Sequence, residues 1–190
     1  KLVEVKDLEI SFGEGSKKFV AVKNANFFIN KGETFSLVGE SGSGKSILMR
    51  SIMSILPNNV DDNYEKFLFD GKEVKKGEKL PISMIFQNPM TSLNPVRTIG
   101  YHLIEVIERF QKKSKKEATE LAIAQLERVG ILNAPLRMKQ YPHELSGGMR
   151  QRILIAMSIL ANPKLLIADE PTTALDVTVQ AQILSLIKKL

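Results

Sequence analysis

The sequence contains no cysteine and no tryptophan, and it has only two histidines among its 190 residues. The absence of cysteine excludes disulfides, thiolate metal sites and cysteine nucleophiles. No apolar run approaches the roughly 18 residues that a membrane-spanning helix requires. The charged start at Lys1–Asp7 is unlike a signal peptide. We therefore expect a soluble intracellular protein.

The remaining composition is that of an ordinary globular domain, with 43% hydrophobic and 25% charged residues. A chain of this length can bury roughly two thirds of the surface that its unfolded form exposes, so it can build a core without covalent cross-links. The net charge of +6 is compatible with a nucleic acid, an acidic membrane or a polyanionic small ligand, and it selects none of them. Four clustered lysines are more typical of a solvated loop or helix start than of a nucleic-acid patch: Lys112, Lys113, Lys115 and Lys116.

Apolar patterning predicts strands in the first part of the chain and helices in the middle. The expected strands are residues 3–12, a strand pair across 19–29, and residues 34–38, 67–69 and 82–86. Helices are expected from residue 47 towards Pro57, on both sides of the lysine cluster across 99–129, at 146–160 behind a Ser146 cap, and at 179–190. The apolar run Leu165–Ala168 is typical of a buried parallel strand.

One glycine-rich segment carries a specific chemical signal. The pattern G-x-x-x-x-G-K-[ST], which chance would produce roughly 0.008 times in such a chain, is matched by Gly39-Glu40-Ser41-Gly42-Ser43-Gly44-Lys45-Ser46. Glycines let backbone N–H groups converge on phosphate oxygens, and the helix that follows adds partial positive charge. We expect Lys45 to contact the β- and γ-phosphates and the Ser46 hydroxyl to bind magnesium.

Two carboxylates follow the apolar run at Leu165–Ala168. A parallel strand delivers its last side chain to the carboxyl edge of the sheet, where Asp169 can hold magnesium opposite Ser46, usually through water. Glu170 comes next and would face the γ-phosphate, where a carboxylate can polarise the attacking water. The alternative is an ordinary acidic loop start, but with the phosphate loop upstream the pair predicts hydrolysis of a nucleoside triphosphate.

A second glycine motif opens the helix predicted at 146–160. Ser146 as the cap, followed by Gly147 and Gly148, makes another anion site. A glycine pair costs helix stability without a local benefit, which argues against an ordinary helix start. Since one nucleotide cannot easily use two separate cradles in one small domain, the second cradle suggests a site shared between two subunits.

Together these motifs resemble the ATPase subunits of ABC transporters over nearly the whole chain. The segments that carry the resemblance, in that family's order and spacing, are Gly39–Ser46, Gln87, Leu145–Gln151, Leu165–Glu170 and Ala174–Asp176. Two further segments resemble the oligopeptide and dipeptide importer branch, which includes nickel importers: Phe86–Pro95 and Tyr141–Leu145.

The resemblance implies further roles. Phe12 falls where the family stacks an aromatic ring on adenine, with a core role as the alternative. Gln87 matches the glutamine that senses magnesium and the attacking water and couples to the membrane subunit. The turn Ser146-Gly147-Gly148 would contact the γ-phosphate of ATP held on the opposite subunit, and Asp176 would lie in the loop that communicates across the dimer. Asp169 matches the family's magnesium-binding carboxylate, and Glu170 matches its catalytic base.

The implied fold is α/β: a P-loop NTPase core with a mostly parallel sheet, an N-terminal antiparallel β-subdomain and an inserted helical subdomain. Residues 1–87 and 161–190 would form the ATP-binding core with the β-subdomain, and 88–160 the helical subdomain with the signature motif. The family also carries a γ-phosphate-contacting histidine well beyond the position of Glu170, whereas His102 and His143 both lie before it. We therefore expect one incomplete nucleotide-binding domain that lacks the C-terminal part of its core.

The implied function is ATP hydrolysis, with ATP and Mg²⁺ as ligands, that drives an importer of oligopeptides or dipeptides. The expected partners are membrane permease subunits, an identical or homologous second ATPase subunit in a head-to-tail dimer and, indirectly, a solute-binding protein, with no nucleic acid. The protein would lie peripherally on the cytoplasmic face of the membrane. The alternatives are a soluble ABC-type ATPase acting on ribosomes or nucleic acid, and a nucleotide-binding fragment without turnover.

Overall fold

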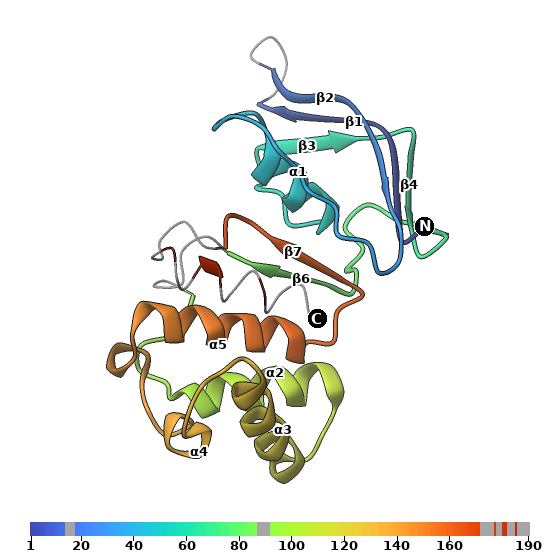
Figure 1. Cartoon of the computed structure of the whole chain (residues 1–190). Coiled ribbons are helices and arrows are strands. Elements are labelled where there is room, and N and C mark those ends of the chain that lie inside the picture. The colour runs from blue at the N-terminus through green and yellow to red at the C-terminus, as the bar shows by residue number, and fades with distance from the viewer. Residues whose placement is uncertain (14–17, 87–91, 172–176, 178–179, 182–184, 186–190) are drawn as a thin grey trace. The chain divides into compact units, whose positions relative to one another are not determined.

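The computed structural model describes residues 1–13, 18–86, 92–171, 177, 180–181 and 185 (Figure 1). The chain forms two compact units, Lys1–Leu80 and Pro81–Leu190. Within the described residues, no helix is both long enough and apolar enough to cross a membrane.

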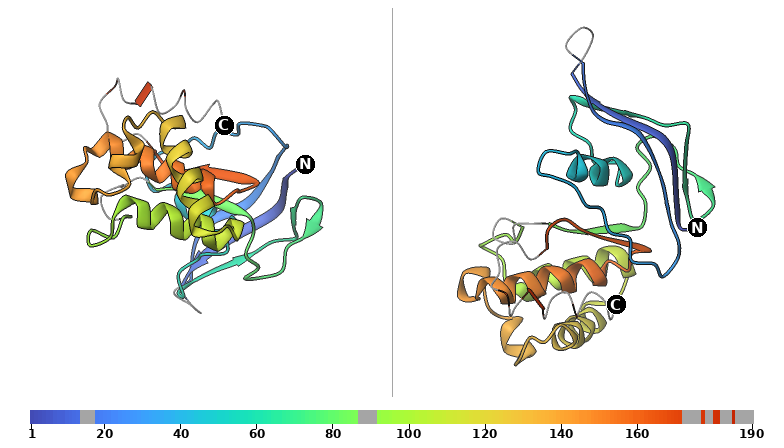
Figure 2. Two further views of the ribbon diagram at one scale, coloured as in Figure 1. Left: turned by 90° about the horizontal axis from the view of Figure 1, so that it is seen from below. Right: turned by 45° about the horizontal axis from the view of Figure 1, so that its top comes forward.

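The first unit is built on a five-stranded antiparallel sheet (Figure 2). Its strands are β1 (Val3–Phe12), β2 (Phe19–Ile29), β3 (Val60–Asn63), β4 (Lys66–Phe69) and β5 (Lys72–Glu73). One edge of β1 pairs with β2, while its other edge pairs first with β4 and then with β3. Asp7 lies between these two pairings with a φ of 50°, and its N–H donates to Asn26 Oδ1 at 3.0 Å. This irregularity lets β1 change partners.

Two strand predictions in this unit are wrong. The segment 19–29 is the single strand β2 rather than a strand pair. The positive φ of Asn24 and the register shifts of the β1–β2 pairing are β-bulges within one strand, and they do not form a turn between two strands. Residues 34–38 form no ladder with any described strand, and Val38 is 89% exposed. A strand needs a hydrogen-bonded neighbour, which an apolar pattern cannot supply by itself.

Helix α1 (Lys45–Ile52) buries Leu48, Ser51 and Ile52 and contacts β1. It ends before the predicted limit at Pro57, because Ser54 adopts a φ of 55°. The Ile55 N–H donates to the Arg50 carbonyl at 3.0 Å, and the Ser54 N–H donates to the Ser51 carbonyl at 2.9 Å. These two bonds form a Schellman motif, which closes the helix.

The second unit combines a parallel strand pair with a helical bundle. Its elements are β6 (Ile82–Ile85), α2 (Ile99–Gln111), α3 (Lys115–Arg128), α4 (Ala134–Arg137), a 3₁₀ turn (Pro142–Glu144), α5 (Gly147–Leu160) and β7 (Leu165–Ala168). Helix α5 lies between the strand pair and helices α2 and α3 (Figures 1 and 2). The core of this unit contains fully buried Leu103 from α2, Leu126 from α3 and Ile153 from α5.

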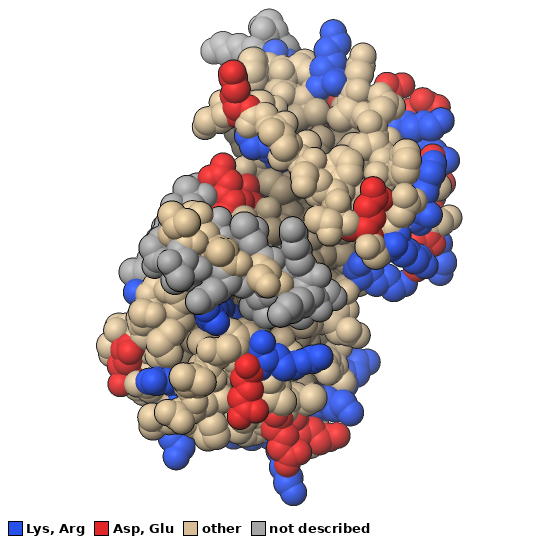
Figure 3. Space-filling model, in the orientation of Figure 1, with Lys and Arg blue, Asp and Glu red and all other residues tan. Residues whose placement is uncertain are grey.

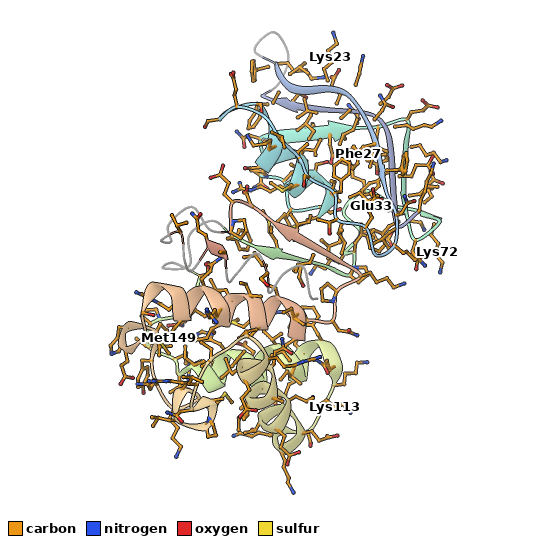
Figure 4. All side chains as sticks on the ribbon, in the orientation of Figure 1. Lys23, Phe27, Glu33, Lys72, Lys113 and Met149 are labelled. Atoms are coloured by element: carbon orange, nitrogen blue, oxygen red, sulfur yellow. The ribbon has the colours of Figure 1, made fainter. Side chains whose placement is uncertain are left out.

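The helices flanking the lysine cluster are confirmed. Lys112 ends α2 in the left-handed conformation, and Ser114 caps α3 in a capping box with Glu117. Lys113 is exposed at this junction and pairs with Glu117 at 3.4 Å (Figure 4). The cluster therefore occupies a solvated helix start.

The strand at Leu165–Ala168 is confirmed as parallel, since it pairs with β6 from Ile82↔Leu165 to Ile85↔Ala168. Its predicted burial is confirmed only at Ile167, because β6 is its one strand neighbour among the described residues. The helix predicted at 179–190 falls mostly outside those residues. Mixed helix and sheet with an antiparallel N-terminal sheet confirm the predicted fold class.

Positive charge is not concentrated on the face of the first unit shown in Figure 3, where basic and acidic side chains are interspersed. The ion pairs of the first unit include Lys31–Asp70, Lys66–Glu4 and Lys76–Asp61. The pKa of Glu4 lies below its ordinary value because the Lys66 side chain donates a hydrogen bond to it.

Candidate functional site

The glycine-rich loop at 39–46 leads directly into α1, as predicted. Gly42 and Gly44 have φ angles of 82° and 90°, in the region that residues with a Cβ avoid. The Ser43 N–H donates to the Glu40 carbonyl at 3.2 Å, which closes a turn inside the loop. The loop therefore owes its shape to backbone conformations that only glycine adopts readily.

Gly44 is also needed for space. A Cβ at this position would lie 2.8 Å from Val22 Cγ2 and 3.1 Å from the Ala21 carbonyl oxygen. Gly44 is the N-cap of α1, where no side chain bonds the helix start, and the first turn of α1 contains no acidic residue. The N-terminus of α1 thus keeps its partial positive charge.

Lys45 folds back over the loop. Its Nζ donates to the carbonyls of Gly39 at 2.6 Å and Glu40 at 2.7 Å. The ammonium group is therefore held inside the loop, beside the start of α1, while Ser46 is exposed in the first turn of that helix. A cation and a helix N-terminus at one loop suit a polyphosphate.

Phe12 lies at the end of β1 in the same unit, half-buried, in register with Phe19 on β2 and Val60 on β3. Its Phe19 neighbour is largely exposed. Phe12 is thus only partly in the core, and its role towards adenine stays a prediction.

The second glycine motif begins α5, as predicted. Ser146 is the N-cap, and its Oγ accepts from the Met149 N–H at 3.3 Å. Met149 lies in the first turn of α5 (Figure 4). A Cβ at Gly147 would meet no atom within 4 Å, and the first turn contains no acidic residue. This helix end is therefore open and keeps its partial positive charge.

The two carboxylates follow β7. The Asp169 N–H donates to the Ile85 carbonyl at 3.0 Å and extends the β6–β7 ladder by one residue. Asp169 is half-buried, and the exposed Glu170 has a φ of 44° immediately before Pro171. A left-handed conformation costs a non-glycine residue about 1–2 kcal/mol, and a following proline restricts it further.

A residue with no role in the sequence interpretation also contacts this turn. Gln151, on α5, donates from Nε2 to the Pro171 carbonyl at 2.8 Å and is 1% exposed. In the sequence, Gln151 is the last residue of the Leu145–Gln151 segment that carries the family resemblance, and it lies four residues before Ile155 on an otherwise apolar helix face, but no role was predicted for it. That pattern alone gives no contact partner.

The predicted site residues divide between the two units. The phosphate loop and Phe12 belong to the first unit, and the start of α5 with the two carboxylates belongs to the second. Gln87 and Asp176 lie outside the described residues. Within the described part of each unit, no group of three or more histidine, aspartate or glutamate side chains gathers as a metal site.

Known proteins are similar to this chain in sequence. The ABC transporter family model matches residues 22–173. The oligopeptide transport ATP-binding protein OppD of Bacillus subtilis is 51% identical over 201 residues, covering 100% of this chain and 56% of OppD. The oligopeptide transport ATP-binding protein OppF of Streptococcus pyogenes is 51% identical over 200 residues, covering 100% of this chain and 63% of OppF. The chain thus spans less than two thirds of these relatives.

A solved structure shows the same fold. The dimeric post-hydrolysis state of the ATP-binding cassette MJ0796, bound to ADP and Pi, matches with a TM-score of 0.80 and 27% identity, covering 99% of this chain and 82% of that one. The family match over most of the chain, and the identity to its relatives over all of it, establish that this protein belongs to the ABC transporter family.

Proposed function

We propose that this protein is the ATP-binding and ATP-hydrolysing subunit of a membrane importer for oligopeptides or dipeptides. The observation that carries the proposal is the loop at 39–46, in which the Lys45 ammonium lies between two backbone carbonyls beside the open start of α1. The similarity to oligopeptide transport ATP-binding proteins supports the substrate class. In this proposal residues 1–87 and 161–190 form the ATP-binding core, and 88–160 form the helical subdomain.

The loop would bind the triphosphate of ATP. On binding, Lys45 would exchange its carbonyl partners for β- and γ-phosphate oxygens, and backbone N–H groups at residues 39–46 would donate to the phosphates. Phe12 would stack on the adenine. The glycine conformations at Gly42 and Gly44 fit this role, because they shape the loop before the ligand arrives.

Magnesium would be held by Ser46, Asp169 and Gln87. When bound, the ion neutralises negative charge on the β- and γ-phosphates. Glu170 would accept a proton from the attacking water, aided by Gln87. The exposure of Glu170 at the end of β7 supports this role, since a general base must reach water and substrate.

A second ATPase subunit would complete the site. The start of α5, with Ser146, Gly147 and Gly148, would contact the γ-phosphate of ATP bound to the partner, and Asp176 would lie at the dimer interface. Hydrolysis removes the bridging phosphate and loosens the dimer, so ATP drives motion through its differential affinity for two states. Permease subunits and a solute-binding protein would complete the importer on the cytoplasmic face of the membrane.

The full-length Glu170→Gln variant tests this proposal. We expect it to bind ATP and magnesium, to hydrolyse no ATP, and to accumulate as a dimer in light scattering, because the γ-phosphate bridge persists. The Lys45→Ala variant is the control and should remain monomeric, since it lacks the phosphate contact. A Glu170→Gln variant that stays monomeric with saturating ATP would contradict the shared site.

The partner class is tested by purification of the full-length protein from solubilised membranes. Co-purification of permease subunits is the expected result. Salt-sensitive binding to RNA or DNA without a permease would instead favour an ATPase that acts on ribosomes or nucleic acid.

A further inference from the structure

The side-chain amide of Gln151 lies next to the turn that carries the two carboxylates. Gln151 is in the second turn of α5, five residues after the Ser146 cap, and is 1% exposed. Its Nε2 donates to the carbonyl of Pro171, the residue after Glu170, at 2.8 Å. This bond connects the helix of the second glycine motif to the end of β7.

Packing alone does not account for a glutamine at this position. Its Oε1 is buried and has no hydrogen-bond donor among the described residues. A buried polar group left without a partner opposes folding, and an apolar side chain of similar length would fill the space without that cost. The hydrogen bond from the Gln151 amide to the Pro171 carbonyl is therefore the feature that glutamine adds.

The turn that receives this bond needs to be held. Glu170 is in the left-handed region, with a φ of 44°, and precedes a proline, which disfavours compact conformations of the preceding residue. Strained backbone persists only where its surroundings fix it. One anchor is the Asp169 N–H bond to the Ile85 carbonyl on β6, and the other is Gln151 bonding Pro171 from α5. The two anchors flank Glu170.

We infer that Gln151 is a positioning residue for ATP hydrolysis, which fixes the backbone of Glu170 through the Pro171 carbonyl. This inference rests on the proposed function, in which Glu170 is the catalytic base. Because Ser146 and Gln151 belong to the same helix, engagement of the start of α5 by a partner's nucleotide is transmitted to the carboxylate over a single hydrogen bond.

The test compares full-length Gln151→Met with Gln125→Met. Gln125 lies on α3 in the same unit, is 5% exposed, and has a buried Nε2 with no partner among the described residues, so it serves as a matched buried glutamine. Displacement of a catalytic group by about 1 Å can cost roughly 100-fold in rate. We expect Gln151→Met to lower kcat by about 10- to 100-fold, with ATP affinity within about twofold of wild type. Gln125→Met should leave kcat within about twofold.

The Gln151→Glu variant provides a readout that a purely structural role would not change. An ionised carboxylate cannot donate to the Pro171 carbonyl, whereas the protonated acid can. Burial raises the pKa of a carboxyl group, so kcat relative to wild type should recover as the pH falls from about 8 to about 6. If the ratio of the Gln151→Glu kcat to the wild-type kcat does not change with pH, the donor role of Gln151 is contradicted. This test can be made even if the Gln151→Met variant does not fold.

Failure of the inference and failure of the proposed function give different results. If the wild type hydrolyses ATP, Glu170→Gln does not, and Gln151→Met keeps its kcat within about twofold of wild type, the positioning role is refuted while the function stands. If Glu170→Gln hydrolyses ATP as the wild type does, the assignment of the base is refuted, and the inference falls with it.

Discussion

The loop at 39–46 contains two left-handed glycines that differ in one respect, which allows a quantitative test. Gly42 and Gly44 have φ angles of 82° and 90°, yet a Cβ at Gly42 would meet no atom within 4 Å. A Cβ at Gly44 would lie 2.8 Å from Val22 Cγ2 and 3.1 Å from a backbone oxygen. Alanine at either position incurs the conformational penalty, but only at Gly44 does it also overlap β2.

The expected free energies follow from these two terms. A left-handed alanine costs about 1–2 kcal/mol, and the reduced entropy of the unfolded chain returns about 0.4–1 kcal/mol. Gly42→Ala should therefore lower the free energy of unfolding by about 1 kcal/mol. Gly44→Ala should lower it by a further 1–3 kcal/mol or so, the typical cost of overpacking, because the backbone oxygen of Ala21 cannot move aside alone.

Urea unfolding of the two full-length variants without nucleotide measures this difference. Omitting ATP matters because both substitutions also disturb the phosphate site, and bound ligand adds its own stabilisation. Equal losses for the two variants would refute the reasoning, since they would show that Gly44 does not approach β2 as closely as the structure has it.

Two further predictions concern the second unit. Leu103→Ala, at a fully buried position of α2, should lower the free energy of unfolding by about 3 kcal/mol. The control Leu121→Ala, at a residue that is 37% exposed, should lower it by less than about 1 kcal/mol. Equal urea midpoints for the two variants would contradict the assignment of Leu103 to the core. The pKa of Glu117 lies below its ordinary 4.5 because the Ser114 side chain and N–H donate to it and Lys113 is nearby, so its stabilisation of α3 is present above pH 4.5 and is lost as the pH falls through the lowered pKa. Ser114→Ala should raise the pKa of Glu117 in an NMR titration. An unchanged pKa would show that the hydrogen bond from the Ser114 side chain does not lower the pKa of Glu117.

The helical half of the chain was predictable because its signals are local. The apolar stripe that places Ile99, Leu103 and Ile107 on one face of α2 and the serine cap at Ser146 depend on neighbours within two turns, and α5 begins where the Ser146 cap predicted. The strand beginning at Leu165 was predictable for a similar reason, since a short apolar run followed by carboxylates is typical of a parallel strand. Strand β3 and helix α4 were not predicted, because their short polar or proline-containing sequences carry little periodicity.

The motifs of the candidate site were also predictable, but their contacts were not. The sequence identified Lys45 as a phosphate ligand, whereas only the structure shows its ammonium on the Gly39 and Glu40 carbonyls. The role of Gln151 could not be predicted from the sequence, because a hydrogen bond between residues 20 positions apart leaves no periodic trace.

The amino-acid sequence by itself determined the family, the phosphate loop, the caps and the order of the motifs, since these depend on residue types at fixed short spacings. Only the tertiary structure decided that residues 34–38 form no ladder with a described strand, that β1 changes partners at Asp7, and that α5 is bonded to the turn after Glu170. The physical reason is that strand pairing and buried hydrogen bonds join groups distant along the chain. Which groups meet is settled by the packing of the whole unit.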